Sequence, residues 1–204
     1  MTAPHPSPLI LPADLLLAIG NNRRCYYHPD DRNLCVKVVH PDIGEKVNNR
    51  EKKYYQLLQK RDISWDRLAR YQGAVATDQG EGLVFDVVRD YDGSIAKTVD
   101  HYLKLEDQQI NDDIVRQIEA LKTYFLRESI VFSDLTTLNM VMRRTAPGSR
   151  HLMIIDGLGH NDAIPLCDFI PAIATKKIKR MWNRKRAHWF DNYPQIKGRV
   201  LNYE

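Results

Sequence analysis

The sequence predicts an α+β protein in which a strand-rich first part precedes a helix-rich second part that contains one small hairpin. Three observations predict this order: short β-branched apolar runs before residue 90, a long helical periodicity after it, and two apolar runs that flank a Pro-Gly turn near residue 147. Strands and helices do not alternate as they do in a doubly wound sheet. With 204 residues, 43% of them hydrophobic and 27% charged, the chain can form a globular core.

The first part of the chain begins with a proline-rich segment. Four of the ten prolines lie in residues 1–12, so we expect residues 1–14 to form an extended arm. Residues 15–40 are predicted to form short strands joined by turns. The clearest of these strands is Leu34–Val39, which is β-branched and apolar except for one lysine, Lys37.

A helix is predicted from Glu45 to about Arg61, followed by a strand over Gly82–Val88 and a turn over Asp90–Ser94. One face of this helix carries residues with helical spacing, namely Val47, Glu51, Tyr54 and Leu58. Glu51 therefore lies on the face that should pack on the core.

The second part of the chain contains two long predicted helices with the hairpin between them. The first, Asn111–Arg127, presents an apolar stripe made of Ile110, Ile114, Ile118, Leu121 and Phe125. Apolar runs follow at 130–132, 140–142 and 152–155, and the turn over Thr145–Ser149 joins the last two as a hairpin. The closing helix is predicted over Asp168–Phe190, with Pro171 in its first turn.

Several classes of protein are excluded by the composition. No apolar run is long enough to cross a bilayer, and the early run Leu15–Ile19 follows Asp14 and lacks the basic flank of a secretory signal. The three cysteines form no CxxC pair, and the seven histidines are scattered, which predicts neither a disulfide framework nor a metal cluster. We therefore expect a reduced, cytoplasmic protein with a formal net charge of +4.

Four features that can carry chemistry follow one another along the chain. Lys37 lies in a strand, Glu51 lies on the inner face of a helix, and Asp134 precedes Asn139 with the spacing D-x-x-x-x-N. Asp156-Gly157 ends an apolar strand. Each feature alone has an ordinary explanation, such as a solvated edge lysine or a capping aspartate. Their order together points to phosphate and metal chemistry.

In this order and spacing the chain resembles the protein-kinase-like superfamily. The resemblance implies a compact two-lobed fold, with a small strand-rich N-lobe over 15–88 and a truncated helical C-lobe over 89–204. It implies ATP and Mg²⁺ as cofactors, an ion pair between Lys37 and Glu51, Asp134 as the catalytic base, and metal ligation by Asn139 and Asp156. Glu45, at the start of the same helix, is an alternative partner for Lys37.

The same resemblance assigns the nucleotide contacts of the N-lobe. Gly20 stands where the family has its phosphate-binding loop, and Asp86 and Val87 belong to the hinge that reads adenine through backbone groups. Strand alternation places Cys35 on the same face as Lys37, so Cys35 would border the adenine. Arg23 and Arg24 follow the loop; we interpret them as solvated turn residues, with phosphate contact as the alternative.

More narrowly, the chain resembles the PhoP regulatory network protein (YrbL) family of enteric bacteria. The phrases that carry this resemblance are Ile19-Gly20-Asn21, Tyr27-His28-Pro29-Asp30-Asp31, Cys35-Val36-Lys37-Val38 and Phe132-Ser133-Asp134-Leu135. The family implies a cytoplasmic protein regulated with envelope stress and magnesium limitation, and it fixes no substrate.

The chain departs from the kinase pattern around its catalytic loop. Phe132-Ser133 replaces His-Arg, Thr136 replaces the usual lysine, Gly157 replaces the Phe of D-F-G, and no A-P-E follows. We therefore expect a phosphotransferase that acts on a hydroxyl of a small molecule or saccharide, with lipopolysaccharide-related acceptors as one class. The alternative is a pseudokinase, a regulatory module that binds a nucleotide or a partner without turnover.

A segment rich in basic residues lies over 176–186. Seven of its eleven residues are basic, and an apolar stripe that includes Trp182 runs through it. One interpretation is a surface helix packed by its tryptophans with a solvated basic face. The other is a contact for an anionic surface, such as lipid phosphates, a phosphorylated saccharide or nucleic acid. Nucleic acid is the least supported, because no helix-turn-helix signature accompanies the segment.

Overall fold

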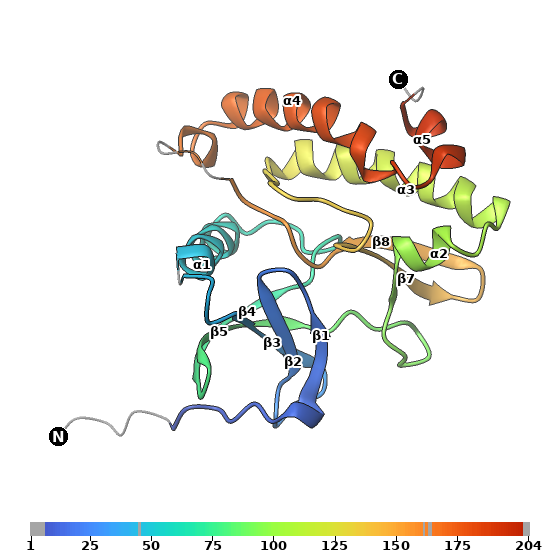
Figure 1. The fold of residues 1–204 in the computed structure, drawn as a ribbon. Coiled ribbons are helices and arrows are strands. Elements are labelled where there is room, and N and C mark those ends of the chain that lie inside the picture. Colours follow the sequence, from blue (N-terminus) through green and yellow to red (C-terminus); the bar gives the residue numbers. More distant parts are fainter. Residues whose placement is uncertain (1–6, 45, 161, 163–164, 202–204) are drawn as a thin grey trace. The chain divides into compact units, whose positions relative to one another are not determined.

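A computed structural model describes residues 7–44, 46–160, 162 and 165–201, and the chain forms two compact units (Figure 1). The first unit contains the chain up to Gln56 together with Ala69–Val87. The second contains Leu57–Leu68 and the chain from Val88 onward. The stretch Leu57–Leu68 thus belongs to the second unit, although it lies in sequence between two parts of the first.

The first unit is built on an antiparallel five-stranded sheet in the order β1-β2-β3-β5-β4. In chain order its strands are β1 (Leu16–Ile19), β2 (Arg23–Tyr27), β3 (Leu34–Val39), β4 (Tyr71–Thr77) and β5 (Gly80–Asp86). The predicted strand over 34–39 is confirmed, and the later one begins and ends two residues earlier than predicted. Strand β4 was not predicted, because Gly73 and its neighbours Gln72 and Ala74 lack the usual β-branched character.

Each face of this sheet is covered by a different part of the first unit. Val36 and Val38 point to one face, where they pack with Leu11 and Leu15 from the N-terminal segment and the short helix η1 (Ala13–Leu15). The predicted extended arm is therefore held down at its described end, and Leu9 also bonds the backbone of Ala76. The alternate residues of β3 face the helix α1 (Lys46–Lys60).

Helix α1 attaches to the sheet through a cluster of aromatic rings. Tyr55 packs edge-on against Phe85 of β5 with ring centroids 4.9 Å apart, and Tyr71 of β4 lies 5.4 Å from the same ring. Aromatic pairs in this geometry add to the gain from burial alone. The cluster fixes how α1 lies on the face of the sheet that carries Lys37.

The second unit is mainly helical. Its helices are α2 (Val99–Leu103), α3 (Gln108–Glu128), α4 (Pro171–Trp189) and α5 (Pro194–Leu201), with a short turn of helix, η2 (Leu166–Asp168), before α4. A small sheet joins β6 (Lys97–Thr98), β7 (Met140–Ala146) and β8 (Ser149–Ile154) in that order. The hairpin and both long helices are confirmed, and the apolar stripe predicted for 110–125 is buried. Helices α2 and α5 are too short to show a periodicity in the sequence.

An aromatic core joins α3, α4 and the loop before Asp134. Phe132 stacks on Phe125 of α3 at 5.4 Å and meets Trp182 and Trp189 of α4 edge-on at 6.1 and 5.9 Å. Figure 1 shows α4 lying along α3. Phe132 is fully buried, so the residue that replaces the histidine of the kinase pattern has a packing role.

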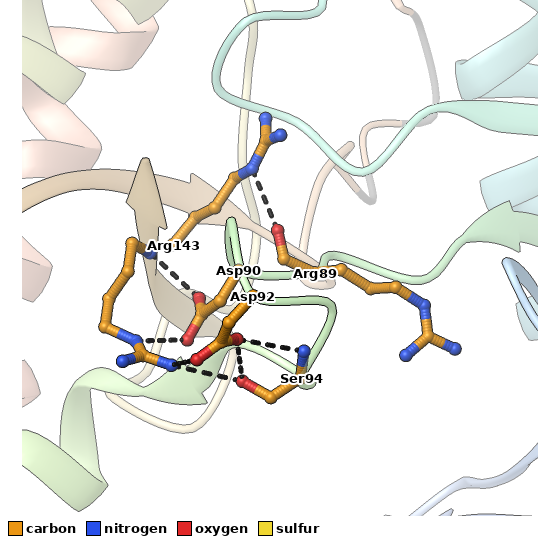
Figure 2. A network of polar contacts seen from close by, with 6 residues as sticks. Arg89, Asp90, Asp92, Ser94 and Arg143 are labelled. Carbon is orange, nitrogen blue, oxygen red and sulfur yellow. Dashed lines mark hydrogen bonds and ion pairs between the residues drawn. The ribbon is translucent and has the colours of Figure 1, made fainter. Parts of the chain in front are cut away.

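The turn predicted over Asp90–Ser94 is held against β7 by a polar network. The buried carboxylate of Asp90 accepts bonds from the backbone and the guanidinium of Arg144, and the same guanidinium reaches Asp92. Figure 2 shows the carboxylates of Asp90 and Asp92 side by side, with Ser94 beside Asp92. Bonds from Ser94, and then the Arg144 guanidinium, lower the pKa of Asp92 to about 2.

None of the helices in the described part of the chain combines the length and the apolar character needed to cross a bilayer.

Candidate functional site

Lys37 lies at the centre of the first unit's sheet. It stands opposite Leu83 in the register of β3 with β5, and its ammonium nitrogen lies 4.5 Å from the centre of the Phe85 ring. Only 8% of the residue is exposed. A lysine this deeply buried is rare without a role, because removing an ammonium from water costs several kcal/mol.

Cys35 shares the sheet face of Lys37, as strand alternation predicts, and lies opposite Phe85. A hydrogen bond with Cys25 and burial raise the pKa of the Cys35 thiol well above its ordinary value. The thiol therefore stays protonated at neutral pH. A protonated thiol suits an uncharged lining of a binding site better than a nucleophile.

Glu51 lies on the inner face of α1, as predicted, and its carboxylate forms an ion pair with Arg23 of β2. Both side chains are nearly buried, with exposed fractions of 10% and 12%. The interpretation of Arg23 as a solvated turn residue is wrong: β2 already begins at this residue. The sequence missed the pair because the two residues lie 28 positions apart. Glu45, the alternative partner for Lys37, lies outside the described residues.

Gly20 lies in the tight turn between β1 and β2. Its N–H donates to the carbonyl of Arg23 at 2.8 Å, and its own carbonyl contacts the imidazole of His40 at 2.9 Å. A Cβ at this position would meet only ordinary contacts, so the turn does not require glycine for steric reasons. The role of Gly20 in a phosphate-binding loop stays a prediction.

Asp86 and Val87, the predicted hinge, already use their backbone donors within the first unit. The N–H of Asp86 donates to the carbonyl of Arg70, and the N–H of Val87 donates to that of Asn33. The role of these two residues in binding adenine stays a prediction, and their N–H groups already have backbone partners.

The loop at Asp134 and the strand end at Asp156 meet in the second unit. The N–H groups of Ser133 and Asp134 both donate to the carbonyl of Gly157, at 2.9 and 3.1 Å. Gly157 has a φ of 89°, and a Cβ there would lie 1.9 Å from the carbonyl oxygen of Asp134. Only glycine fits this approach, which explains why the position after Asp156 carries no side chain.

Asn139 completes this arrangement. Its side-chain amide nitrogen donates to the backbone carbonyl of Asp134 at 2.9 Å. The backbone carbonyl of Asn139 accepts the N–H of Ile155 at 3.0 Å. Asp156 is the next residue, and one of its carboxylate oxygens accepts the N–H of Gly157 at 2.6 Å. The structure thus brings together three residues that the sequence singled out, Asp134, Asn139 and Asp156.

Lys185 is a residue of this site that the sequence did not single out. It lies on α4, half-buried, and its ammonium donates to the carbonyl of Ser133, directly before Asp134. In the sequence Lys185 is one of seven cations in the basic segment, with nothing to distinguish it. The contact places a positive charge beside the loop in which Thr136 replaces the usual lysine.

A second cluster lies between the strand end at Asp156 and α4. His160, Asp162 and Cys167 bring three metal-ligand atoms within 4.8 Å of one another, a grouping that the scattered histidines did not predict. The ring of His160 contacts Asp168 at 2.8 Å, and the ammonium of Lys177, on α4, pairs with Asp162 and lowers the pKa of that carboxyl. These internal partners satisfy the cluster, so we treat it as an anchor for the start of α4.

Comparison with known proteins places the chain in a family. The model of the family described as PhoP regulatory network protein YrbL matches residues 9–189. The chain belongs to this family. The YrbL proteins of Escherichia coli (strain K12) and Shigella flexneri are each 34% identical to it over 173 residues, covering 82% of this chain and 81% of each relative.

The fold of this chain is kinase-like. A crystal structure of the protein kinase Rad53, residues 1–466 in complex with AMP-PNP, matches with a TM-score of 0.54 and 14% identity. The match covers 93% of this chain and 59% of that chain, so this chain spans less than two thirds of its length. At this identity the likeness concerns the fold, and it agrees with the α+β kinase-like architecture predicted from the sequence.

Proposed function

We propose that the chain is an ATP- and Mg²⁺-dependent phosphotransferase that acts on a hydroxyl group of a small molecule or saccharide. The arrangement of Asp134, Asn139 and Asp156 around the backbone of Gly157 carries the proposal. A turn that needed only to connect two strands would not require such a close approach between glycine and a carbonyl. Lipopolysaccharide-related saccharides are the narrower class of acceptor that we favour, from the regulatory setting of the family.

The residues present fit a magnesium ion. The amide nitrogen of Asn139 is directed to the Asp134 carbonyl, which leaves its Oδ1 as the ligand atom. Asp156 supplies a carboxylate, and Mg²⁺ prefers oxygen ligands of these two kinds. The bound ion would neutralise charge on the phosphates of the nucleotide.

Four further residues have proposed roles. Lys37 would contact the phosphates with its buried ammonium, and Glu51 would orient the charged groups around it. Asp134, which is exposed, would accept a hydrogen bond from the acceptor hydroxyl and take its proton. Lys185 would hold the loop in place by donating from its ammonium to the backbone carbonyl of Ser133.

A pseudokinase remains the second candidate, because one observation favours it. Glu51 pairs with Arg23, a contact that no step of phosphoryl transfer uses. A chain that had lost turnover could keep such a pair to stabilise the first unit.

Ligand-dependent stability and phosphate release separate the two candidates. Thermal unfolding of the full chain is measured with ATP and Mg²⁺, ATP with EDTA, and Mg²⁺ alone. At ATP about a hundredfold above its dissociation constant, binding raises the unfolding free energy by about 2.7 kcal/mol. Lys37→Ala should abolish this gain, whereas Lys53→Ala, on the exposed side of α1, should leave it unchanged.

Turnover is then measured as phosphate release and as transfer to a panel of saccharides. Asp134→Asn should keep the stabilisation and lose the turnover. Stabilisation by ATP in a wild-type chain that never turns over would favour the pseudokinase. No stabilisation at all would reject the phosphotransferase and any pseudokinase that binds ATP, and would leave only a module that binds a partner.

A further inference from the structure

The exposed face of α4 carries only positive charge. Between Pro171 and Trp189 the helix has no acidic residue. Its exposed cations are Lys176, Lys179, Arg180 and Arg184. Other basic residues of the segment are engaged inside the second unit, since Lys177 pairs with Asp162 and Lys185 donates to Ser133.

An exposed apolar cluster, which we call the apolar tip, adjoins this face at the start of α4. Its members and their exposed fractions are Leu166 (50%), Phe169 (71%), Ile170 (43%) and Ile173 (38%). Single exposed apolar residues are normal on protein surfaces, but four within eight positions form a patch of the kind that marks an interaction site.

Ile173 of the apolar tip and three of the exposed cations lie on one side of the helix. Ile173, Lys176, Arg180 and Arg184 follow one another at spacings of three or four residues, which places them along one face of an α-helix. Burial of Ile178 and Trp182 on the opposite face confirms that this side points outward. The surface therefore changes along α4 from apolar at its start to cationic along its length.

We propose that this face docks on the surface of an anionic phospholipid bilayer, with the apolar tip in the headgroup region and the cations on lipid phosphates. Charge complementarity favours this partner, because α4 itself carries basic residues and no acidic one. Peripheral helices bind membranes with the same combination of aromatic or aliphatic residues and a basic face.

Nucleic acid fits the face less well. Contacts with nucleic acid commonly use aromatic rings between the cations to stack on bases. The tryptophans of α4 cannot do so, because Trp182 is fully buried and Trp189 is only 6% exposed. The exposed apolar residues lie beside the cations, at one end of the helix, where a bilayer would receive them.

Vesicle binding by the full chain tests the proposal without nucleotide, so its outcome is separate from that of the proposed function. Cosedimentation is measured with phosphatidylcholine vesicles that contain or lack phosphatidylglycerol. We expect binding only to the anionic vesicles, falling steeply with added salt. The Lys176→Gln/Arg180→Gln variant should bind about 25-fold more weakly, at about fivefold for each cation near the surface.

Two further variants separate the apolar tip from general effects of charge. Phe169→Ala should weaken binding about tenfold, because the ring leaves water on docking. Lys53→Gln/Lys60→Gln removes two exposed cations from α1 and should bind like the wild type. Circular dichroism verifies that each variant is folded.

Three results would overturn the proposal. The first is equal binding to neutral and anionic vesicles, and the second is unchanged binding by the Phe169→Ala or Lys176→Gln/Arg180→Gln variant. The third is tighter binding to duplex DNA at the same salt, with the same loss in the cation variant, which would assign the face to nucleic acid.

Discussion

Replacing Gly157 with alanine should displace the loop that carries Asp134. The backbone at Gly157 has a φ of 89°, a conformation that costs a residue with a Cβ about 1 to 2 kcal/mol. The added Cβ would also lie 1.9 Å from the carbonyl oxygen of Asp134, and backbone cannot turn aside as a flexible side chain can. The loop must therefore move away from the strand end.

This movement breaks the two hydrogen bonds that Ser133 and Asp134 donate to the Gly157 carbonyl. Each contributes about 1 kcal/mol. The Gly157→Ala variant should then lose about 3 to 4 kcal/mol of unfolding free energy, the sum of the backbone and hydrogen-bond contributions.

Gly148 provides a matched control. Its φ is 74°, and a Cβ added there meets no atom within 4 Å. The Gly148→Ala variant shares the unfavourable φ without the clash, so it should lose only about 1 to 2 kcal/mol. The difference between the two variants isolates the contact with the Asp134 loop.

Urea unfolding measures both variants, followed by tryptophan fluorescence and by circular dichroism. Trp182 and Trp189 report on the region because both rings pack on Phe132, two residues before Asp134. Coincident transitions with the two probes are needed before free energies are compared. Losses that agree within about 0.5 kcal/mol for the two glycine variants would refute the steric reasoning, since that is the usual scatter between independent sites.

Three further predictions follow from the second unit. The pKa of Asp92, lowered to about 2 by the contacts described above, means that its stabilising contribution is complete above the ordinary value of 3.8 and is lost as the pH falls toward 2. Asp92→Asn should therefore lower the urea midpoint at neutral pH, and the difference in midpoint between the variant and the wild type should vanish in acid. A difference in midpoint that does not vary with pH would contradict this. Lys185→Gln removes the ammonium donor to the loop and should reduce the unfolding free energy by about 1 to 2 kcal/mol, whereas Lys179→Gln, on the exposed face, should change it by less than about 0.5 kcal/mol. Phe132→His restores the kinase residue but buries an imidazole in an aromatic core, so urea unfolding should show a loss of about 2 to 4 kcal/mol, and an unchanged midpoint would argue against the packing role.

Local patterns in the sequence predicted the elements that frame the candidate site. Residues within a few helical turns or one strand determine three of these elements. They are the apolar stripe of α3, the hairpin of β7 and β8, and strand β3, which carries Lys37. The spacing between Asp134 and Asn139 is also local, because a short loop returns the asparagine side chain to the carbonyl of Asp134. Such features depend on backbone geometry that the nearby residues themselves impose.

The tertiary structure alone decided which distant groups meet. Arg23 with Glu51, Lys185 with Ser133, and Lys177 with Asp162 pair across separate elements. Many cations and carboxylates in the chain could satisfy one another equally well by charge. Only the packing of strands and helices brings the atoms of one particular pair within hydrogen-bond distance. The spacing of the residues along the sequence therefore cannot predict which pair forms.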